Sequence, residues 1–349
     1  MRVLVAMSGG VDSSVAALVL QEQGHEVTGV TLRLWGGASD RGCCSVADVE
    51  DARRVAGQLG IDHHVFNMAD EFNRLVVDPY VAAHQAGSTP NPCIDCNRHL
   101  KFDLLLESAR RLGFDRLASG HHARVTMADH GVELRRGHDP AKDQSYVLSM
   151  LGPEQLAMLL LPVGELTKAE VRELALSRGL ITSTKAESQD TCFIESSGGR
   201  RRFLGERIEL HRGTLVDAHT NEEVGHVDEL ELVTVGQRRG LGIDESGQRR
   251  VAVDIDVARR AVLVADPASS LIDWVALEPT SITWTATPVG EGTQVLVQLR
   301  SHAPAIPAIW RGDRLELLES SAPVASGQTA AVYRADDPAV VLGSGVVIR

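Results

Sequence analysis

The chain has 349 residues, enough for two or three domains of ordinary size that each bury an apolar core. Its formal net charge is −12 at pH 7, so the chain as a whole does not attract nucleic acid, which could bind only at a local basic patch. With 43% hydrophobic and 23% charged residues, the composition is that of a globular protein and excludes a disordered one.

The apolar segments are short. The longest uninterrupted runs, at residues 15–20 and 156–161, fall far below the roughly 20 residues that span a bilayer. The first residues lack the pattern of a signal peptide. Five cysteines are few and odd in number, which argues against a disulfide scaffold. We therefore expect a cytoplasmic protein with no membrane partner, in which each thiol has to be considered for chemistry.

In the first 120 residues, short apolar strands alternate with helical stretches, which is typical of a parallel sheet with helices on both faces. We predict strands at residues 3–6, 26–34, 63–66 and 116–118, and helices at 13–23, 45–59 (with Ser45 as N-cap), 70–84 and 99–112. The fold class of this part is a doubly wound α/β domain, whose ligands bind beyond the carboxyl ends of the strands.

The pattern changes after residue 146. We predict two amphipathic helices, at 154–160 and 168–178, that complete the first domain. From residue 212 turn signals recur every eight to twelve residues, which indicates β-structure, and a stretch near 267–277 precedes strands at 294–299, 305–310, 314–318, 329–333 and 340–348. The predicted organisation is a nucleotide-binding domain (1–200), a small β-rich central domain (201–268) and a C-terminal antiparallel β-barrel (269–349).

The strongest local motif is SGGVDSS at residues 8–14, between the first strand and the first helix. Two glycines let the backbone approach an anion, the serines add donors, and the helix offers free N–H groups and its positive dipole end. A phosphate-binding loop is therefore expected here. The chain has no G-x-x-x-x-G-K-[ST] motif, which excludes the usual P-loop.

The cysteines are placed unevenly. Cys93 and Cys96 form a C-x-x-C before a predicted helix, where the dipole, Arg98 and Lys101 would favour a thiolate on Cys96. Cys192 lies alone in a later polar loop. Cys43 and Cys44 are adjacent, and we interpret them as small loop residues.

Residues 200–260 are the least repulsive part of the chain toward RNA. Eleven arginines nearly balance twelve acidic residues there, with arginine clusters at 200–202 and 238–239. Arginines beside glycines suit contacts to a phosphate backbone, although such pairs are also common on ordinary surfaces.

Six separated motifs resemble, in the same order, those of the tRNA-specific 2-thiouridylase family of the ATP-pyrophosphatase superfamily. They are the loop at 8–13, N-P-x-x-x-C-N at 91–97, G-H at 120–121, K-D-Q-S-Y at 142–146, D-T-C-F-I at 190–194 and T-V-G-Q-R-R-G-L-G at 234–242. The superfamily cleaves ATP between the α and β phosphates and adenylates a carbonyl oxygen. The resemblance implies that the C2 oxygen of a tRNA wobble uridine is adenylated and then replaced by sulfur, with release of AMP and pyrophosphate.

The resemblance also implies roles for individual residues. Cys192 would carry a persulfide, Cys96 would be the nucleophile that helps to release its sulfur, and the two could form a disulfide after turnover. The implied ATP contacts are Ala6, Met7, Ser8, Gly9, Gly10, Val11, Asp12, Ser13, Leu32 and Gly120, with Asp12 helping to hold Mg²⁺ on the phosphates. The implied tRNA contacts are His121, Lys142, Asp143, Gln144 and Gln328. The implied partners are the anticodon stem-loop of tRNA and a persulfide-donating protein, such as a cysteine desulfurase or a relay protein.

One residue departs from the family pattern, because many members carry an aspartate where this chain has Cys93. Cys93, Cys96 and Cys192 could instead hold an iron–sulfur cluster. A zinc site would need a fourth ligand, such as Cys43, Cys44 or His99, and the usual paired C-x-x-C spacing is missing. Two rival functions stay open: an ATP-dependent amide-forming ligase, which would need the loop but not the cysteines, and a nucleotide- or RNA-binding regulator without turnover.

Overall fold

The computed structural model describes residues 1–34, 46–128, 131–186, 193–194, 198–244 and 246–348. Ser45, Cys43, Cys44 and Cys192 lie outside these ranges, so the N-cap, the adjacent cysteines and the second proposed catalytic thiol stay predictions. Within the described ranges, no helix combines the length and the apolar character needed to cross a membrane.

The N-terminal part is built on a parallel sheet with the strand order β3-β2-β1-β4-β7. The strands are β1 (Arg2–Ala6), β2 (Glu26–Arg33), β3 (Asp62–Asn67), β4 (Arg116–Ser119) and β7 (Leu159–Leu160). The first four confirm the predicted strands. Because β1 pairs with β2 on one side and with β4 on the other, the strand order reverses at β1, and the loops after β1 and β4 border the crevice at this reversal.

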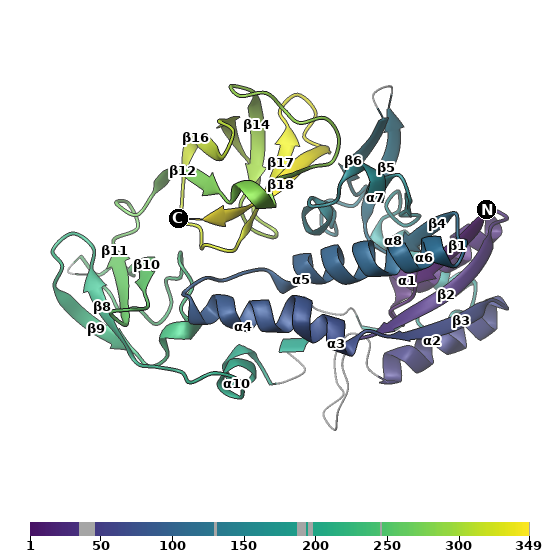
Figure 1. Cartoon of the computed structure of the whole chain (residues 1–349), viewed down its shortest axis with the longest axis horizontal. Helices are drawn as coiled ribbons and strands as arrows, with labels where there is room; N and C mark the ends of the chain where they lie inside the picture. The colour runs from purple at the N-terminus through teal and green to yellow at the C-terminus, as the bar shows by residue number, and fades with distance from the viewer. Residues whose placement is uncertain (35–45, 129–130, 187–192, 195–197, 245, 349) are drawn as a thin grey trace.

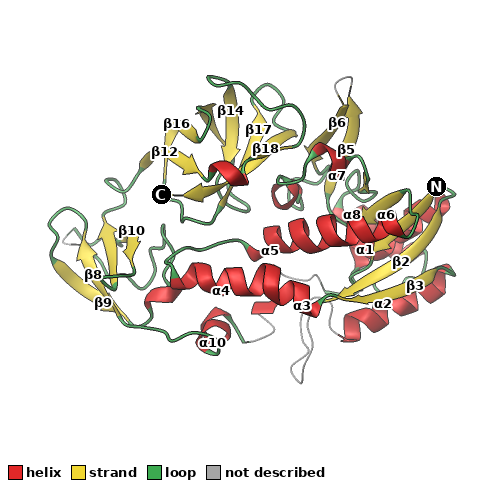
Figure 2. Cartoon of the chain, in the orientation of Figure 1, coloured by secondary structure: helices red, strands yellow, loops and turns green. Residues whose placement is uncertain are grey.

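Helices cover both faces of the sheet, as predicted (Figure 2). Successive residues of β1 point to opposite faces: Val3 and Val5 enter one core and Leu4 the other. The first face carries α1 (Val11–Glu22), α2 (Val46–Leu59) and α8 (Lys168–Ser177). The second carries two helical runs: α3 (Ala69–Phe72), η1 (Asn73–Val77) and α4 (Asp78–Gln85), then α5 (Pro92–Asp95), η2 (Cys96–Leu104) and α6 (Leu105–Arg111).

The helix predicted over 154–160 is wrong beyond its first turn. α7 covers only Pro153–Leu156, and the next apolar residues form β7, which pairs in parallel with Leu117 and Ala118 of β4. An apolar run can serve either element, and here the open edge of β4 offers backbone hydrogen bonds. The Pro162 ring disfavours helical backbone at the residue before it.

A hairpin that the sequence analysis did not predict follows β4. Its strands are β5 (Ala123–Ala128) and β6 (Gly131–Arg136), and β6 also pairs with the C-terminal strand β18 (Val340–Ile348). The hairpin therefore joins the first domain to the C-terminal sheet through a pairing some 200 residues apart in the chain.

The middle of the chain is mainly β-structure, as predicted. After α10 (Arg200–Gly205) come β8 (Gly213–Asp217), β9 (Glu223–Val227), η4 (Leu230–Leu232), β10 (Val251–Asp256) and β11 (Ala261–Ala265). The sheet order is β10-β11-β8-β9, around a separate core that includes Leu241 and Val262.

The C-terminal strands close into a six-stranded antiparallel barrel, which confirms the predicted barrel. The ring runs β12 (Ile272–Leu277), β16 (Arg314–Ser321), β15 (Ile306–Trp310), β14 (Gln294–Gln298), β17 (Thr329–Arg334) and β18, which pairs back with β12. η5 (Pro279–Ser281) and β13 (Thr283–Trp284) flank it. β12 lies in the stretch that we expected to precede the barrel.

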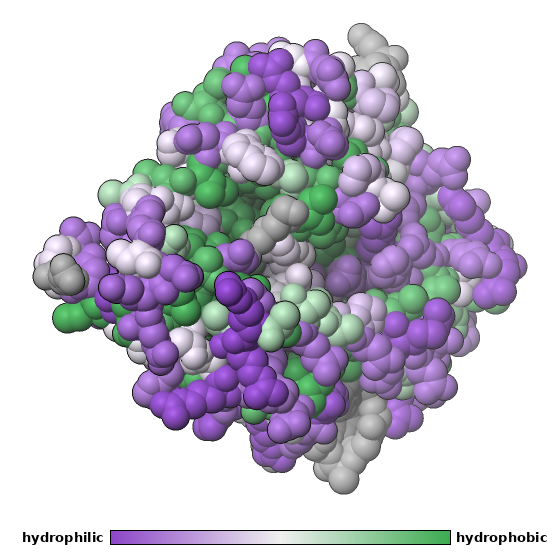
Figure 3. Space-filling model, turned by 60° about the vertical axis from the view of Figure 1, so that its left-hand side comes forward, coloured by the Kyte–Doolittle hydropathy of each residue, from purple (hydrophilic) through white to green (hydrophobic). Residues whose placement is uncertain are grey.

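The two helical runs of the second face extend side by side from the sheet toward the central β-unit, with the barrel above them (Figure 1). Viewed with the central unit brought forward, hydrophilic residues dominate the surface and hydrophobic ones gather around a central hollow (Figure 3). The three parts of the chain thus meet around the helix that carries Cys93 and Cys96.

Candidate functional site

The loop after β1 is shaped so that only glycine fits at its centre. Gly9 has φ +71°, in the left-handed region, and a Cβ there would collide with the backbone carbonyl of Asp48. Gly120, directly after β4, packs against the start of α1, where a Cβ would lie 2.5 Å from the Ser13 amide nitrogen. These two predicted ATP contacts therefore lie together at the strand-order reversal.

Serine side chains hold the loop in this shape. Ser13 Oγ accepts from the Ser8 N–H (3.2 Å) and donates to the Gly10 carbonyl (3.1 Å), to which Ser14 Oγ also donates (2.8 Å). Gly10 is the N-cap of α1 and has no side chain with which to bond the first N–H groups of the helix. A phosphate is the natural partner for such N–H groups.

Two lysines approach the loop from distant parts of the sequence. Lys168 Nζ lies 2.6 and 2.7 Å from the two carboxylate oxygens of Asp12, and His122 Nε2 lies 3.1 Å from Oδ1. Lys185 Nζ donates to the Gly9 carbonyl (3.0 Å) and pairs with Asp48 (2.8 Å) and Asp51 (2.6 Å). Both ammonium groups beside the loop are thus paired with carboxylates of the chain.

The environment of Asp12 keeps it ionised. Burial would raise the pKa of its carboxyl group, but the hydrogen bonds from His122 and Lys168 outweigh burial, and the pKa is lowered. The carboxylate that we expected to help hold Mg²⁺ is thus bonded to Lys168 and His122. Over the described part of the chain, no group of three or more His, Cys, Asp or Glu residues is arranged to hold a metal ion.

The remaining predicted ATP contacts lie at the end of β1, at the start of α1 and near the end of β2. Ala6 ends β1, Val11 starts α1, and the backbone of Met7 continues the sheet through its bond to the Val30 carbonyl. Leu32 is buried near the carboxyl end of β2, within the second core. A side chain of this kind can form the wall of an adenine pocket or simply fill the core.

Cys93 and Cys96 lie on the helical run α5–η2–α6, here called the cysteine helix. It starts at Pro92, earlier than the predicted residue 99. The Asn91 side chain caps it by accepting from the Cys93 N–H (3.1 Å), and proline suits the first helical position. Cys93 is therefore in the first turn and Cys96 one turn further, at the start of the widened segment η2. Both side chains are half-buried.

Phe193, which follows Cys192 in the sequence, packs among aromatic rings of α4 and α10. The Phe193 ring lies 6.0 Å from that of Tyr80 on α4 and 5.1 Å from that of Phe203 on α10. Burial raises the pKa of Tyr80 to about 12, while Arg200 and Cys93 both act electrostatically on its hydroxyl group. Phe193 thus contacts both α4 and α10.

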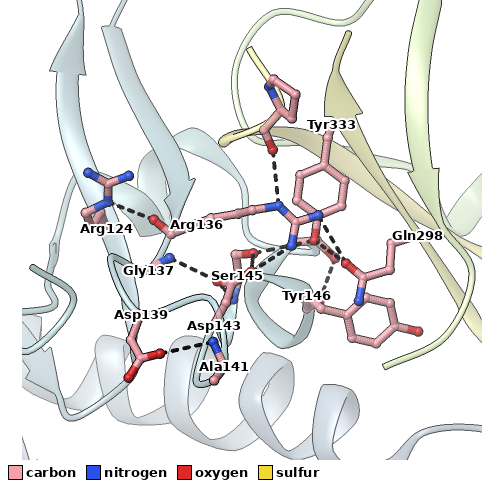
Figure 4. Close-up of polar contacts among 12 residues, drawn as sticks. Arg124, Arg136, Gly137, Asp139, Ala141, Asp143, Ser145, Tyr146, Gln298 and Tyr333 are labelled. Atoms are coloured by element: carbon pink, nitrogen blue, oxygen red, sulfur yellow. Dashed lines mark hydrogen bonds and ion pairs between the residues drawn. The ribbon is translucent and has the colours of Figure 1, made fainter. Parts of the chain in front are cut away.

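The predicted tRNA-binding segment 142–144 is held by hydrogen bonds within the chain. The Asp143 carboxylate is used within the chain: it accepts from Arg136 (2.8 Å), the Gly137 N–H (3.0 Å) and both the N–H and the hydroxyl group of Ser145 (3.0 and 2.9 Å; Figure 4). Lys142 is half-buried and Gln144 exposed. Asp143 thus shapes the segment, and Gln144 is also bonded within the chain, since its Oε1 accepts from the His122 N–H (2.9 Å).

The other two predicted tRNA contacts lie on opposite sides of the cysteine helix. His121 is buried, with Nδ1 2.8 Å from Ser119 Oγ and its ring beside Phe102 of η2. Gln328, from the barrel, donates through Nε2 to the Thr89 carbonyl, just before that helix. Thr89 also donates to Thr234 Oγ1 (3.3 Å), so the approach to the helix touches both β-rich parts.

The sequence analysis missed Lys168, Lys185 and His122 at the loop. Lys168 opens α8 behind the capping box of Thr167 and Glu170, which marks a helix start but carries no sign of phosphate chemistry. His122 is adjacent to a residue that was selected, whereas no spacing or motif distinguishes Lys185. Only folding brings these three residues to the loop.

Comparisons with known proteins agree on the kind of protein that has this site. Residues 1–196 match the family model described as tRNA methyl transferase HUP domain, and residues 201–266 match the tRNA methyl transferase PRC-barrel domain. Over its full length the chain is 44% identical to the tRNA-specific 2-thiouridylase MnmA of Roseiflexus castenholzii, covering 99% of it. It is 44% identical to the protein of that name from Chloroflexus aurantiacus (98% covered) and 42% identical to that from Mycobacteroides abscessus (100% covered).

Among solved structures, a 4-thiouridine synthetase–RNA complex with bound ATP resembles 57% of the chain, with 46% of that protein covered. The TM-score is 0.39 and the identity 17%, too low to support any inference about ligands.

Proposed function

Because the chain belongs to the tRNA-specific 2-thiouridylase family, we propose that it uses ATP to replace the C2 oxygen of the wobble uridine of tRNA by sulfur. Such an enzyme is a tRNA sulfurtransferase that binds both ATP and RNA. The observation that carries the proposal is the loop at the β1–β4 crevice, where Gly9 and Gly120 leave no room for side chains and the N-terminus of α1 has no side-chain cap.

In the first step, the phosphates of ATP lie on residues 8–13 and the adenosine extends toward Leu32 and Gly120. The uridine O2 attacks the α-phosphorus, pyrophosphate leaves, and AMP stays bonded to the base. Lys168 and Lys185 stabilise the charge that develops on the leaving pyrophosphate. ATP is taken as its magnesium complex, in which the ion neutralises phosphate charge.

In the second step, sulfur reaches the adenylated base from Cys192, which receives a persulfide from a donor protein. The Cys96 thiolate attacks the inner sulfur of this persulfide, which forms a Cys96–Cys192 disulfide and releases hydrosulfide. Hydrosulfide then attacks C2 of the base and displaces AMP. The base has to leave the anticodon stack to reach the site, and Lys142, Gln144 and Gln328 contact the RNA in this proposal.

The test separates the two steps. In Cys96→Ser and Cys192→Ser we expect no 2-thiouridine, while pyrophosphate is still released from ATP in the presence of unmodified tRNA. The assay contains tRNA, ATP, Mg²⁺ and a persulfide donor, and measures both products. Full thiolation in either variant would overturn the thiol mechanism. If the wild type and both variants all release pyrophosphate but make no 2-thiouridine, an ATP-dependent amide-forming ligase becomes the favoured function.

A further inference from the structure

A small cavity lies between the cysteine helix and the barrel. Its volume is about 120 Å³, and the cysteine helix lines one side of it with residues that include Asp95 and Arg98. The barrel contributes Thr329 of β17 and residues 344–346 of β18. Because Asp95 directly precedes Cys96, the cavity adjoins the residue that the proposed function places at the reacting base.

The walls of the cavity are held in place by contacts between the barrel and the segment before the helix. The Thr89 N–H donates to the Ser326 carbonyl (2.8 Å), and Gln328 Nε2 donates to the Thr89 carbonyl. Gly327, with φ +87°, lies so close to Pro90 that a Cβ there would be 3.1 Å from the proline nitrogen. Both Gly327 and Pro90 line the cavity, which is therefore preformed, as small-ligand sites usually are.

Two charged side chains of the cavity have no hydrogen-bond partner among the described residues. No group in those ranges donates to the Asp95 carboxylate or accepts from the Arg98 guanidinium group. Burial raises the pKa of Asp95, and the nearby charges of His99 and Arg98 oppose this only in part. A carboxylate that has lost part of its hydration is destabilised unless a donor replaces the water. The cavity therefore presents an acceptor and a donor, three residues apart on one helix, to a ligand.

The chemistry of this pair selects one kind of ligand. An acceptor beside a donor complements a ring edge on which an N–H group adjoins a carbonyl oxygen. Uracil has this edge at N3–H, whereas cytosine has an unprotonated N3 that a carboxylate would repel. A cavity of about 150 Å³ holds a benzene ring, so the cavity here matches the single ring of a pyrimidine better than the two rings of a purine. The buried side chains of Ile94 and Met150 supply apolar surface for such a ring.

The base that fits here is distinct from the base that reacts. Successive residues of a helix point about 100° apart, so Asp95 and Cys96 face different directions. Cys96 packs against the second core and does not line the cavity. A base bonded to Asp95 therefore lies beside the base that reaches Cys96, which is the relation between neighbouring nucleotides.

We propose that the cavity binds the uracil base of a nucleotide that flanks the reacting uridine, with Asp95 accepting from N3–H and Arg98 donating to a carbonyl oxygen. The inference deepens the proposed function, on which it rests, by giving the enzyme a site that reads RNA sequence. Sequence-specific recognition of RNA commonly uses unstacked loop bases in this way. Asp95 is then a specificity-determining residue and takes no part in adenylation or sulfur transfer.

The experiment measures the binding of labelled anticodon stem-loop RNAs to the full-length protein by fluorescence anisotropy. One RNA has uridine at the wobble position and at both flanks, and in two others a cytidine replaces the 5′ or the 3′ flanking uridine. We expect one cytidine RNA to bind the wild type about 5- to 150-fold more weakly than the all-uridine RNA, which is the usual discrimination of a paired base contact. A 3-methyluridine at that flank should weaken binding as much, because it removes the N3–H donor.

The variant Asp95→Asn replaces the carboxylate by an amide, which can also donate to N3 of cytosine. The ratio of the two affinities should therefore fall toward one. Weak binding that comes from the folding of the RNA loop itself would persist in this variant. The matched control is Glu107→Gln, which makes the same change in an exposed ion pair on α6 and should keep the wild-type ratio.

The inference is overturned if the wild type binds all these RNAs equally, or if Asp95→Asn keeps the wild-type ratio. Formation of 2-thiouridine on the same RNAs, measured separately, distinguishes this inference from the proposed function. Thiolation without discrimination overturns the base-reading site alone. Discrimination without thiolation overturns the proposed function and leaves the cavity as an RNA contact.

Discussion

The carboxylate of Asp12 connects three distant parts of the chain at the phosphate loop. Asp12 lies in the first turn of α1, His122 follows β4, and Lys168 starts α8. The Lys168 side chain is 12% exposed, so its bond to Asp12 is shielded from solvent. A charge-assisted bond of this kind contributes more than a surface ion pair. Lys168 is therefore held beside the loop on which the proposed function places the phosphates.

We expect Lys168→Met to impair the adenylation step. Loss of a charged hydrogen bond costs roughly 1.5–3 kcal/mol, which corresponds to about 10- to 150-fold in the rate of pyrophosphate release. The measurement is pyrophosphate release at saturating tRNA. Arg178→Met is the control, since Arg178 is near the other end of α8 in an exposed pair with Glu22. Equal rates in the two variants would remove Lys168 from the first step.

The helix α4 carries a buried histidine to the boundary with the central unit. His84 is 1% exposed, and its Nδ1 lies 3.0 Å from the Glu231 carbonyl of η4. Burial lowers the pKa of His84 to about 4, Arg200 acts in the same direction, and the bond to Glu231 only partly opposes them. The ring is thus neutral in the folded protein and part of the packing between the two units.

This pKa makes the stability of the protein depend on pH. In the unfolded chain a histidine titrates near 6.5, so between pH 6.5 and 4 the unfolded state binds more protons and acid favours unfolding. The contribution of His84 is complete above pH 6.5 and falls by roughly 3 kcal/mol as the pH drops to 4. We expect denaturant midpoints between pH 7 and 4 to fall less steeply in His84→Gln than in the wild type.

The control for this measurement is His226→Gln, which changes an exposed histidine on β9. Its pH profile should parallel that of the wild type. If His84→Gln also parallels the wild type, His84 does not set the acid limit of stability.

At the scale of the whole molecule, a polar cluster fastens the barrel to the first domain. Arg136, at the end of β6, bonds to Asp143 (2.8 Å) and to the barrel residue Gln298 (3.3 Å), and its guanidinium carbon lies 3.9 Å from the centre of the Tyr333 ring. Tyr333 also donates to Gln298 (3.0 Å; Figure 4). Because Asp143 is nearly buried, it would be left without its cation if Arg136 were removed.

We expect Arg136→Met to loosen the attachment of the barrel and to lower the free energy of unfolding by about 3–5 kcal/mol, the usual cost of leaving a buried partner charge uncompensated. Amide hydrogen exchange should become faster at β6 and at the start of β18, while β1 and β4 keep their protection. Arg311→Met is the control, because it removes an exposed ion pair with Glu316 within the barrel. Unchanged exchange at β6 would show that β-pairing alone holds the units together.

Local patterns in the sequence determined much of the fold and part of the site. The strands of the first sheet, the barrel strands and the SGGVDSS loop follow from periodicity, glycine conformation and helix termini, which depend on neighbouring residues. The pairing of β6 with β18 and the conversion of residues 159–160 into a strand depend on partners far away in the chain, which no local pattern specifies.

The same distinction separates the residues of the site. The sequence by itself identified the SGGVDSS loop between a strand and a helix and placed the C-x-x-C next to a helix, since each motif lies within a few consecutive residues. Only the tertiary structure decided that Lys168, Lys185 and His122 lie at the loop, that Asp143 supports a domain junction, and that Phe193 packs against Tyr80. Ion pairs and side-chain contacts form wherever packing brings groups together, and their energies depend on distance in space and not on separation along the chain.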